Sequence, residues 1–253
     1  AGTAEGTAAI SIAFADLAGN NGTSVITTTD ASSVRVDRTA PTITLVAPSA
    51  SSFVNVADVG YTLSEAIASG KVTYTRTLGS ADSGSPHTQN LSGAELNTGA
   101  RSLAALASAP TLVDGAVYTI DFDATDAAGN AATQKSVAAV TFDTTLPTLS
   151  PVTIASNNST TTLAKETEVI TITFTSSEAI ATPTVTIAGA SASSVNNISS
   201  ATSWTATLTV AAGTTEGIAA ISIAFADLAG NNGTTVIATT NGSSVRVDRT
   251  APT

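Results

Sequence analysis

The residues of this sequence whose types and spacing could do chemistry are its acids. One acidic signature is Asp-x-x-Gly-Asn, which occurs at residues 16–20, 126–130 and 227–231. A second is Asp-x-Thr-x-Pro-Thr, which occurs at residues 37–42, 143–148 and 248–253. A Ser-Glu-Ala tripeptide occurs at residues 64–66 and 177–179, and no Lys or Arg recurs beside it or beside Asp-x-x-Gly-Asn. Uncompensated carboxylates at short range repel one another, so a bound cation is a natural remedy wherever the fold brings them together.

The rest of the composition argues against most catalytic chemistry and several classes of partner. The chain has no Cys and a single histidine, His87, which excludes thiolate nucleophiles, disulfides and paired-histidine metal sites. Nine Lys and Arg against nineteen Asp and Glu give a net charge of −10, which argues against a nucleic-acid partner. The apolar runs are too short to cross a bilayer, so no membrane insertion is expected in this segment. Because no nucleophile–base pair or phosphate loop stands out, we expect no enzyme activity.

The acidic signatures lie in repeated units. Residues 1–42 and 212–253 agree at 36 of 42 positions, at an offset of 211 residues. The boundary aspartates Asp37, Asp143 and Asp248 lie 106 and then 105 residues apart, a period that suits whole tandem domains. The sequence therefore predicts three units. They are a two-strand C-terminal fragment of a preceding domain at 1–41, a complete domain at 42–146, and a second complete domain, of the same type as 1–41, at 147–253.

The local pattern indicates β-structure throughout. Apolar residues alternate with small or polar ones, as at Ile221, Ile223 and Phe225, which is the period of a half-buried strand. Thr, Val and Ile dominate these runs, and Gly-Asn, Asn-Gly and Ser-Gly pairs separate them. Strands are expected at residues 10–14, 117–122, 137–142, 169–174, 185–187, 204–210 and 221–225. About six to eight short strands per unit predict an all-β fold of tandem immunoglobulin-like Greek-key β-sandwiches, arranged as beads on a string.

Three stretches carry a resemblance to a known family. They are AKETEVITITFTSSEAIATPTVTIAG at 164–189, EGIAAISIAFADLAGNNGT at 216–234 and VRVDRTAPT at 245–253. The chain resembles the bacterial Ig-like tandem repeats of giant calcium-dependent cell-surface adhesins, of the RTX-adhesin extender type. The resemblance implies a place outside the cell, on the bacterial surface, and calcium at the domain junctions. The first complete domain departs from the pattern by an extra loop, LGSADSGSPHTQN at 78–90, which suggests two alternating domain types.

The strand order of such a sandwich predicts where the acids meet. The turn after the second strand and the turn between the last two strands lie at one pole, and the incoming linker reaches the same pole. Ser-Glu-Ala occupies the first of these turns and Asp-x-x-Gly-Asn the second. Three carboxylates from distant segments should therefore converge in each complete domain. The two expected groups are Asp37, Glu65 and Asp126, and Asp143, Glu178 and Asp227, the latter joined by Asn231.

Ligation by oxygen alone points to a hard cation, and an irregular, flexible cage favours Ca²⁺ over Mg²⁺. The hypothesis is one structural Ca²⁺ or more at each domain junction. Asp114 and Glu216 are expected at the opposite pole, where Asp114 would approach the next junction. The full set of candidate metal ligands is Asp16, Asn20, Asp37, Glu65, Asp114, Asp126, Asn130, Asp143, Glu178, Glu216, Asp227, Asn231 and Asp248.

Simpler interpretations of the same residues stay open. Asp-x-x-Gly-Asn is also typical of a tight turn in which Asp caps backbone amides and Gly or Asn takes a positive φ. Asp-x-Thr-x-Pro could merely end a strand, because Pro blocks further pairing. Arg38 and Arg249 directly follow two of the boundary aspartates and could pair with them.

Four other residues are expected to have no functional role. Asp121 and Asp123 alternate with Ile and Phe, which is typical of a solvated strand face. His87 lies in a polar loop and is expected to be inert. Trp204 is expected to lie in the core rather than to form a sugar-stacking platform.

The leading functional prediction is a structural repeat segment of a long extracellular bacterial adhesin stalk or surface filament, stiffened by Ca²⁺ between neighbouring Ig-like domains of the chain. One alternative is a module that binds glycan or protein directly through the 78–90 loop. Another is a spacer of a secreted hydrolase or of a phage tail protein. Residues 1–41 raise a separate question, because a hairpin without further strands is only marginally stable in water. They are either an excerpt of a longer array or a segment that completes a neighbouring copy by strand exchange in a filament.

Overall fold

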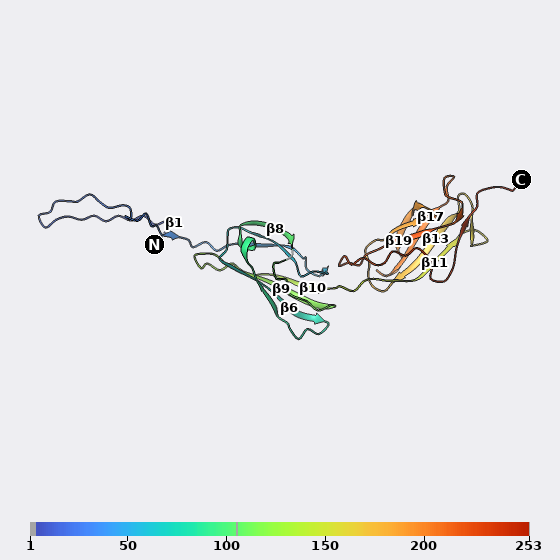
Figure 1. Ribbon diagram of the computed structural model, residues 1–253, viewed down its shortest axis with the longest axis horizontal. Coiled ribbons are helices and arrows are strands. Elements are labelled where there is room, and N and C mark those ends of the chain that lie inside the picture. Colours follow the sequence, from blue (N-terminus) through green and yellow to red (C-terminus); the bar gives the residue numbers. More distant parts are fainter. Residues whose placement is uncertain (1–3, 105, 253) are drawn as a thin grey trace.

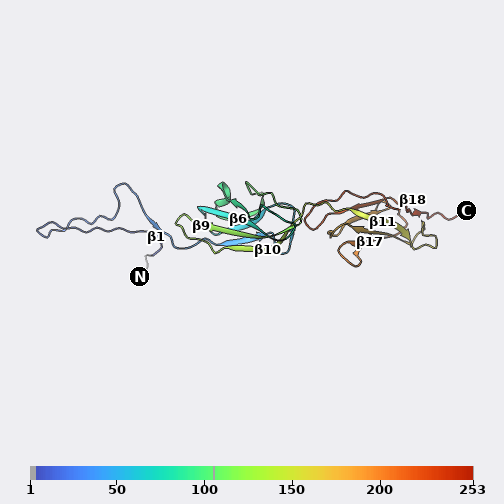
Figure 2. The same cartoon turned by 90° about the horizontal axis from the view of Figure 1, so that it is seen from below.

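The chain is an extended string of three β units. The computed structural model describes residues 4–104 and 106–252, in which a long hairpin, a β-sandwich and a second β-sandwich follow one another (Figure 1). The view turned by 90° shows the same succession along the long axis (Figure 2). In the described part of the chain the single helical element is the 3₁₀ turn η1, Gly93–Leu96, and no helix is long and apolar enough to cross a membrane. The predicted all-β class and tandem sandwich architecture are confirmed.

The hairpin, residues 4–41, is held by a few contacts between its two arms. Strand β1 (Gly6–Thr7) pairs antiparallel with β2 (Arg35–Val36), and isolated bridges join the arms further out. The strand expected at residues 10–14 is absent as a ladder, and only Ile12 makes a bridge, to Val25. In the equivalent segment of the second sandwich, the ladder forms with another strand of the sandwich rather than with the other arm. The sequence at 10–14 therefore needs a third strand beside it to form a regular strand.

The first sandwich contains two sheets, in which most strand pairs are antiparallel. One sheet has the order β3-β5-β8, with β3 Ile43–Ala47, β5 Val59–Leu63 and β8 Gly99–Ala104. The other has the order β4-β10-β9-β6-β7, with β4 Phe53–Val54, β10 Lys135–Phe142, β9 Ala116–Thr125, β6 Ser69–Gly79 and β7 His87–Asn90. The strands predicted at 117–122 and 137–142 are confirmed as parts of β9 and β10. The two sheets leave the β5–β6 and β9–β10 turns at the pole that the linker enters.

Alternation along β9 separates the core from solvent. Its residues are buried and half-buried in turn, so that Ile120 and Phe122 point inward while Asp121 and Asp123 stay half-exposed. Phe122 packs on Tyr61 of the other sheet, with ring centroids 4.7 Å apart. The two aspartates contact polar neighbours of the same sheet, as the prediction of a solvated face requires.

The second sandwich has three short sheets built from ten strands. The largest has the order β11-β13-β17-β16, with β11 Leu149–Ser156, β13 Val169–Ser176, β17 Ser203–Thr209 and β16 Ser194–Asn197. A second has the order β12-β20-β18, with β12 Leu163–Ala164, β20 Arg246–Val247 and β18 Gly217–Ile218. The third has the order β15-β14-β19, with β15 Ala190–Ser191, β14 Thr184–Ile187 and β19 Ile221–Ala224. The strands predicted at 169–174, 185–187, 204–210 and 221–225 are confirmed, with ends that differ by one or two residues.

Trp204 lies in the core of the second sandwich, as predicted. It is 6% exposed and belongs to the cluster that includes Phe174, Ile172 and Ile223. Its indole N–H donates to the carbonyl of Ala201 at 3.2 Å, which satisfies the one polar atom of the ring. Because it is the single Trp of the chain, its fluorescence reports on this sandwich alone.

The segment predicted as an extra loop at 78–90 is loop only at residues 80–86, because β6 runs to Gly79 and β7 begins at His87. Asp82 of this loop is bound to the neighbouring strands. His87 Nε2 lies 2.7 Å from Asp82 Oδ2, and the Tyr118 hydroxyl donates to the same oxygen at 2.7 Å. The Val113 amide donates in turn to the Tyr118 oxygen at 3.0 Å. Burial raises the pKa of Tyr118 to about 12, while the hydrogen bonds from Tyr118 and then His87 lower the pKa of Asp82. His87 therefore lies at the start of β7 and not in the polar loop that the sequence predicted, and its side chain makes a structural contact.

Replacing Tyr118 by Phe should lower the free energy of unfolding of the first sandwich by about 1–3 kcal/mol, because it leaves Val113 N–H and Asp82 each short of a buried partner. Urea unfolding followed by far-UV circular dichroism measures the change. Thr119→Ala on the same strand, which touches neither group, is the matched control. Equal stability of the two variants would show that the loop is not held by this network.

Candidate metal centres

Three carboxylates converge where the hairpin linker enters the first sandwich. Asp37, Glu65 and Asp126 each place one oxygen within 4.8 Å of the other two. Asp37 comes from the linker, Glu65 from the β5–β6 turn and Asp126 from the β9–β10 turn. The strand order therefore brings together the group that the sequence predicted, from segments up to 89 residues apart (126 − 37).

The same arrangement recurs between the two sandwiches. Asp143 of the linker, Glu178 of the β13–β14 turn and Asp227 of the turn after β19 also lie within 4.8 Å of one another. Asp227 is buried, and Glu178 and Asp143 are half-buried. The second expected group is thus also assembled, at the junction that joins the two complete domains.

The Asp-x-x-Gly-Asn turn fixes one acid of each group. Asp126 Oδ1 accepts the amides of Ala128 and Asn130, both at 2.8 Å, and its Oδ2 accepts the Asn130 side-chain amide at 2.8 Å. Gly129 has a φ of +93°, a conformation that L side chains rarely adopt. The Asn130 hydrogen bonds lower the pKa of Asp126, so this carboxylate stays ionised at the pole. The tight-turn interpretation is correct, and it coexists with the acidic group.

The serine of Ser-Glu-Ala holds the neighbouring glutamate beside the linker. Ser64 Oγ accepts the amide of Thr42 at 2.8 Å, and Ser177 Oγ accepts the amide of Thr148 at 3.0 Å. Thr42 and Thr148 each close an Asp-x-Thr-x-Pro-Thr signature. The glutamates that follow these serines therefore face the acidic residue at the start of each linker.

The carboxylates of the second group repel one another. Burial raises the pKa of Glu178, and the negative charges of Asp143, Asp227 and Asp114 raise it further. Glu178 Oε1 is buried and has no hydrogen-bond partner among the described residues. A buried carboxylate oxygen without a partner, facing two more carboxylates, fits a cation site of oxygen ligands. At the first group Arg35 compensates part of the negative charge, because its guanidinium Nη1 lies 3.7 Å from Asp37 Oδ2.

The asparagines of the Asp-x-x-Gly-Asn turns donate hydrogen bonds to the linker. Asn130 Nδ2 donates to the Asp37 carbonyl at 3.2 Å, and Asn231 Nδ2 donates to the Asp143 carbonyl at 2.8 Å. Asn231 Oδ1 accepts a hydrogen bond from Asn55 of the preceding sandwich at 3.1 Å. These hydrogen bonds give Asn130 and Asn231 a positioning role, and their ligation of a cation through oxygen stays a prediction.

Asn55 is a junction residue that sequence reasoning missed. It follows β4, and the residue at the same place after β12 of the second sandwich is Lys165. No repeat signature marks the position, because the two domain types differ there. Its contact with Asn231 joins the far pole of one sandwich to the near pole of the next.

The acids expected at the opposite pole accept hydrogen bonds from the outgoing linker. Asp114 accepts the Thr144 amide at 2.5 Å, the Thr144 hydroxyl at 2.9 Å and the Thr145 hydroxyl at 2.9 Å. Glu5 and Glu216 accept the same kind of bonds from the linkers that follow them. These acids therefore fix the direction of the linker, and Asp114 approaches the next junction, because it binds the two residues that follow Asp143.

Three remaining candidates lie outside both acidic groups found among the described residues. Asp16 and Asn20 form the same turn as their counterparts, at the tip of the hairpin. Asp248 accepts the amide of Thr250 at 3.3 Å, as the other two linker aspartates accept the amide two residues on. Arg249, expected as a partner of Asp248, lies 4.0 Å from Glu216 instead.

Two family models match consecutive parts of the chain. Residues 37–144 and residues 143–246 each match a family model described as a bacterial Ig-like domain. A solved structure of Clostridium thermocellum CbhA fibronectin(III)-like modules is 17% identical, with a TM-score of 0.36, over 82% of this chain and 93% of that one. The search of curated proteins found no match. The chain is therefore a tandem array of bacterial Ig-like domains.

Proposed function

We propose that the chain is a structural segment of a long extracellular bacterial adhesin stalk or surface filament, whose domain junctions are stiffened by Ca²⁺. The observation that carries the proposal is the repetition of one acidic group at two successive junctions, each built from a linker, a Ser-Glu-Ala turn and an Asp-x-x-Gly-Asn turn. A group that always includes the linker acid is suited to control the angle between neighbours. Bacterial Ig-like domains are typically found outside the cell or exposed on its surface, which supports the location.

The protein's own contacts explain why the junction would respond to a cation. Both sandwiches bind the linker at Asp143. Asp114 of the first sandwich accepts the amide of the next residue, Thr144, and Asn231 of the second sandwich donates to the Asp143 carbonyl. The Asp143 carboxylate faces Glu178 and Asp227, so repulsion within the group pushes the linker away from the second sandwich when the charges are uncompensated. Ca²⁺ bound by Asp143, Glu178 and Asp227 would neutralise that repulsion and crosslink the linker to both turns.

Calcium binding by the full chain tests the proposal. Isothermal titration with a chelator-stripped sample should show two bound Ca²⁺ per chain, one for each acidic group. Mg²⁺ at the same concentration should compete weakly, because the half-buried, irregular groups do not offer a rigid octahedron. A chain that takes up no Ca²⁺ at millimolar concentration would leave the acids as turn and linker residues only.

A further inference from the structure

The chain contains three Asn-Gly pairs, at residues 21–22, 232–233 and 241–242. Such a pair can lose its side-chain amide without a catalyst, because the glycine nitrogen can attack the asparagine Cγ and glycine has no side chain that obstructs the attack. The reaction requires a glycine nitrogen that can move onto Cγ. All three pairs lie in the described part of the chain, so the structure shows which of them meet this requirement.

In the first two pairs the glycine is fixed by its neighbours. The Gly22 amide donates to the Phe14 carbonyl at 2.8 Å, and the Gly233 amide donates to the Phe225 carbonyl at 3.0 Å. The ring of the same phenylalanine packs on each glycine, so closely that it lies where a Cβ of that glycine would be. Attack by either nitrogen would break a backbone hydrogen bond and disturb the contact with the ring.

The third pair has neither restraint. Gly242 is exposed, and no atom lies within 4 Å of the position that its Cβ would take. Among the described residues its amide has no hydrogen-bond acceptor. Asn241 is exposed too, and its Oδ1 accepts the Ser243 amide at 3.0 Å. This hydrogen bond folds the side chain back over the backbone that follows it and draws electron density away from Cγ, which favours attack there.

The turn that contains Asn241 holds β11, the first strand of the second sandwich. The Thr240 amide donates to the Val152 carbonyl, and the Val152 amide donates to the Thr240 hydroxyl, both at 2.9 Å. On the other side of the turn, the Ser243 hydroxyl accepts the Ile154 amide at 3.0 Å. Both contacts can be made only while the backbone keeps its length between Thr240 and Ser243.

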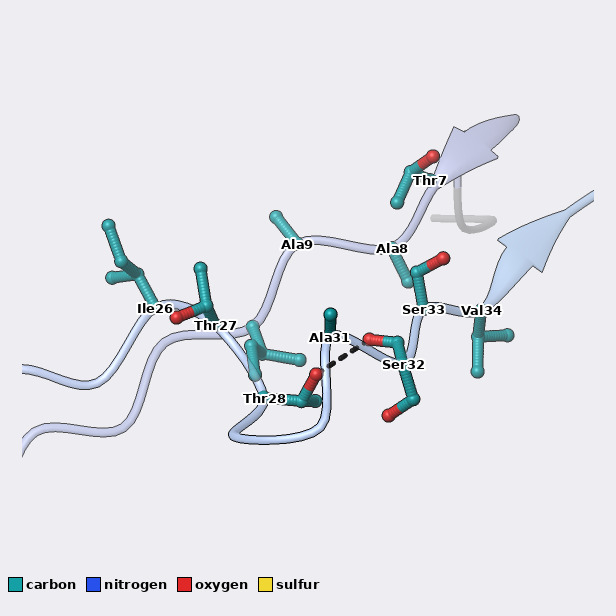
Figure 3. Close-up of a pocket in the computed structure, with 11 residues that line it drawn as sticks. Thr7, Ala8, Ala9, Ile26, Thr27, Thr28, Ala31, Ser32, Ser33 and Val34 are labelled. Atoms are coloured by element: carbon teal, nitrogen blue, oxygen red, sulfur yellow. Dashed lines mark hydrogen bonds between the residues drawn. The ribbon is translucent and has the colours of Figure 1, made fainter.

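The other copy of the repeat shows that this turn accepts an aspartate in place of the asparagine. Asp30 stands at the position equivalent to Asn241, and its Oδ1 accepts the Ser32 amide at 3.0 Å, as the asparagine does in the second copy. The Thr28 hydroxyl closes the turn by donating to the Ser32 carbonyl at 2.7 Å (Figure 3). Ala31 follows with a φ of +58°, so the turn also accepts a side chain at the glycine position.

We propose that Asn241 is a site of spontaneous covalent modification, at which the side-chain amide is lost through a cyclic imide. The Gly242 nitrogen bonds to Asn241 Cγ and gives up its proton, the Cγ–Nδ2 bond breaks, and ammonia leaves. Water then opens the five-membered ring. Cleavage of the bond between the Gly242 nitrogen and Cγ gives aspartate, and cleavage of the bond between this nitrogen and the backbone carbonyl carbon of Asn241 gives isoaspartate. Water is the only co-reactant.

The two products differ in their effect on the second sandwich. Aspartate leaves the backbone unchanged, and the turn at Asp30 shows that it keeps the same hydrogen bonds. Isoaspartate adds one carbon to the backbone between Thr240 and Ser243, so the turn can no longer make both of its contacts with β11. The modification therefore loosens the second sandwich through its isoaspartyl product. This inference does not depend on Ca²⁺.

The test incubates the full chain at mildly alkaline pH and follows each asparagine by peptide mass spectrometry with separation of aspartyl and isoaspartyl forms. In the folded chain, Asn241 should convert at least ~10-fold faster than Asn232, because the Gly233 amide must first leave its hydrogen bond. In concentrated urea the two rates should be similar, since both residues precede glycine. Equal rates in the folded chain, or faster conversion of Asn232, would overturn the proposal.

Gly242→Ala is the matched variant, because the alanine at position 31 shows that the turn can fold with this side chain. The added methyl group obstructs the attack, so Asn241 should convert more slowly while Asn232 keeps its rate. Conversion of Asn241 at the parent rate in this variant would contradict attack by the Gly242 nitrogen.

Thermal unfolding followed by Trp204 fluorescence tests the effect on the second sandwich. Asn241→Asp should melt at the temperature of the unmodified parent, whereas an incubated parent sample rich in isoaspartate should melt at a lower temperature. An isoaspartate-rich sample that melts like Asn241→Asp would contradict the loss of the contacts with β11.

Discussion

Replacing Glu178 by Gln should weaken one of the two Ca²⁺-binding events on the order of 100-fold, because a neutral amide replaces one of three clustered carboxylates. The side chain is the most informative of the group, since its Oε1 is buried with no hydrogen-bond partner among the described residues, and its pKa is raised by burial and by its acidic neighbours. Isothermal titration of the full chain measures both stoichiometry and affinity. The first group, at Asp37, should keep its binding event.

The melting temperature of the same variant is a second readout, because it should change in opposite directions in chelator and in Ca²⁺. In chelator, Glu178→Gln should raise the melting temperature of the second sandwich, because it removes a buried charge that Asp143 and Asp227 repel. In Ca²⁺ it should lower the melting temperature, because the bound cation stabilises the folded state of the parent chain. Glu166→Gln, an exposed acid outside the group, is the matched control and should show neither effect. Two undiminished binding events in Glu178→Gln would contradict the assignment of this site.

Replacing Ile223 by Ala should lower the free energy of unfolding of the second sandwich by about 2–5 kcal/mol, because a fully buried side chain leaves a cavity among Val185, Val236 and their neighbours. The repeat offers its own control, since Ile12 occupies the same sequence context and is 58% exposed. Ile12→Ala should change stability by less than about 0.5 kcal/mol. Differential scanning calorimetry of the whole chain, with Trp204 fluorescence to assign the second sandwich, measures both. Equal losses would mean that the hairpin is packed in solution.

Much of the fold follows from period-two patterning and the repeat. Val169–Ser176 and Ala116–Thr125 alternate so regularly that their strand character needs no tertiary information. The segment at 10–14 shows where such reasoning fails. It is identical to 221–225, yet it forms no ladder, because the strand that pairs with 221–224 is missing beside it among the described residues. Burial and strand formation here are properties of the neighbours and not of the local sequence.

The acidic groups could be predicted because each acid belongs to a repeated signature and the strand order of the sandwich fixes which turns share a pole. The supporting contacts could not be predicted. Asn55 carries no signature, and its partner Asn231 lies 176 residues away in the next domain. The Asp82–His87–Tyr118 network joins the β6–β7 loop to β7 and β9, and that loop occurs in one domain only, so the repeat offers no equivalent for comparison. The direction of the Asn130 and Asn231 amides depended on where the linker carbonyls lie, which only the assembled junction shows.

Small-angle X-ray scattering of the full chain, in Ca²⁺ and then in excess chelator, tests the central claim most directly. Calcium-stiffened junctions predict a large maximum dimension in Ca²⁺, followed by a smaller maximum dimension and a broader distance distribution on chelation. A chain with Asp37→Asn and Asp143→Asn should scatter like the chelated parent under both conditions. Unchanged curves on chelation, with no calcium found by elemental analysis, would contradict the claim and leave packing and the linker contacts as the source of stiffness.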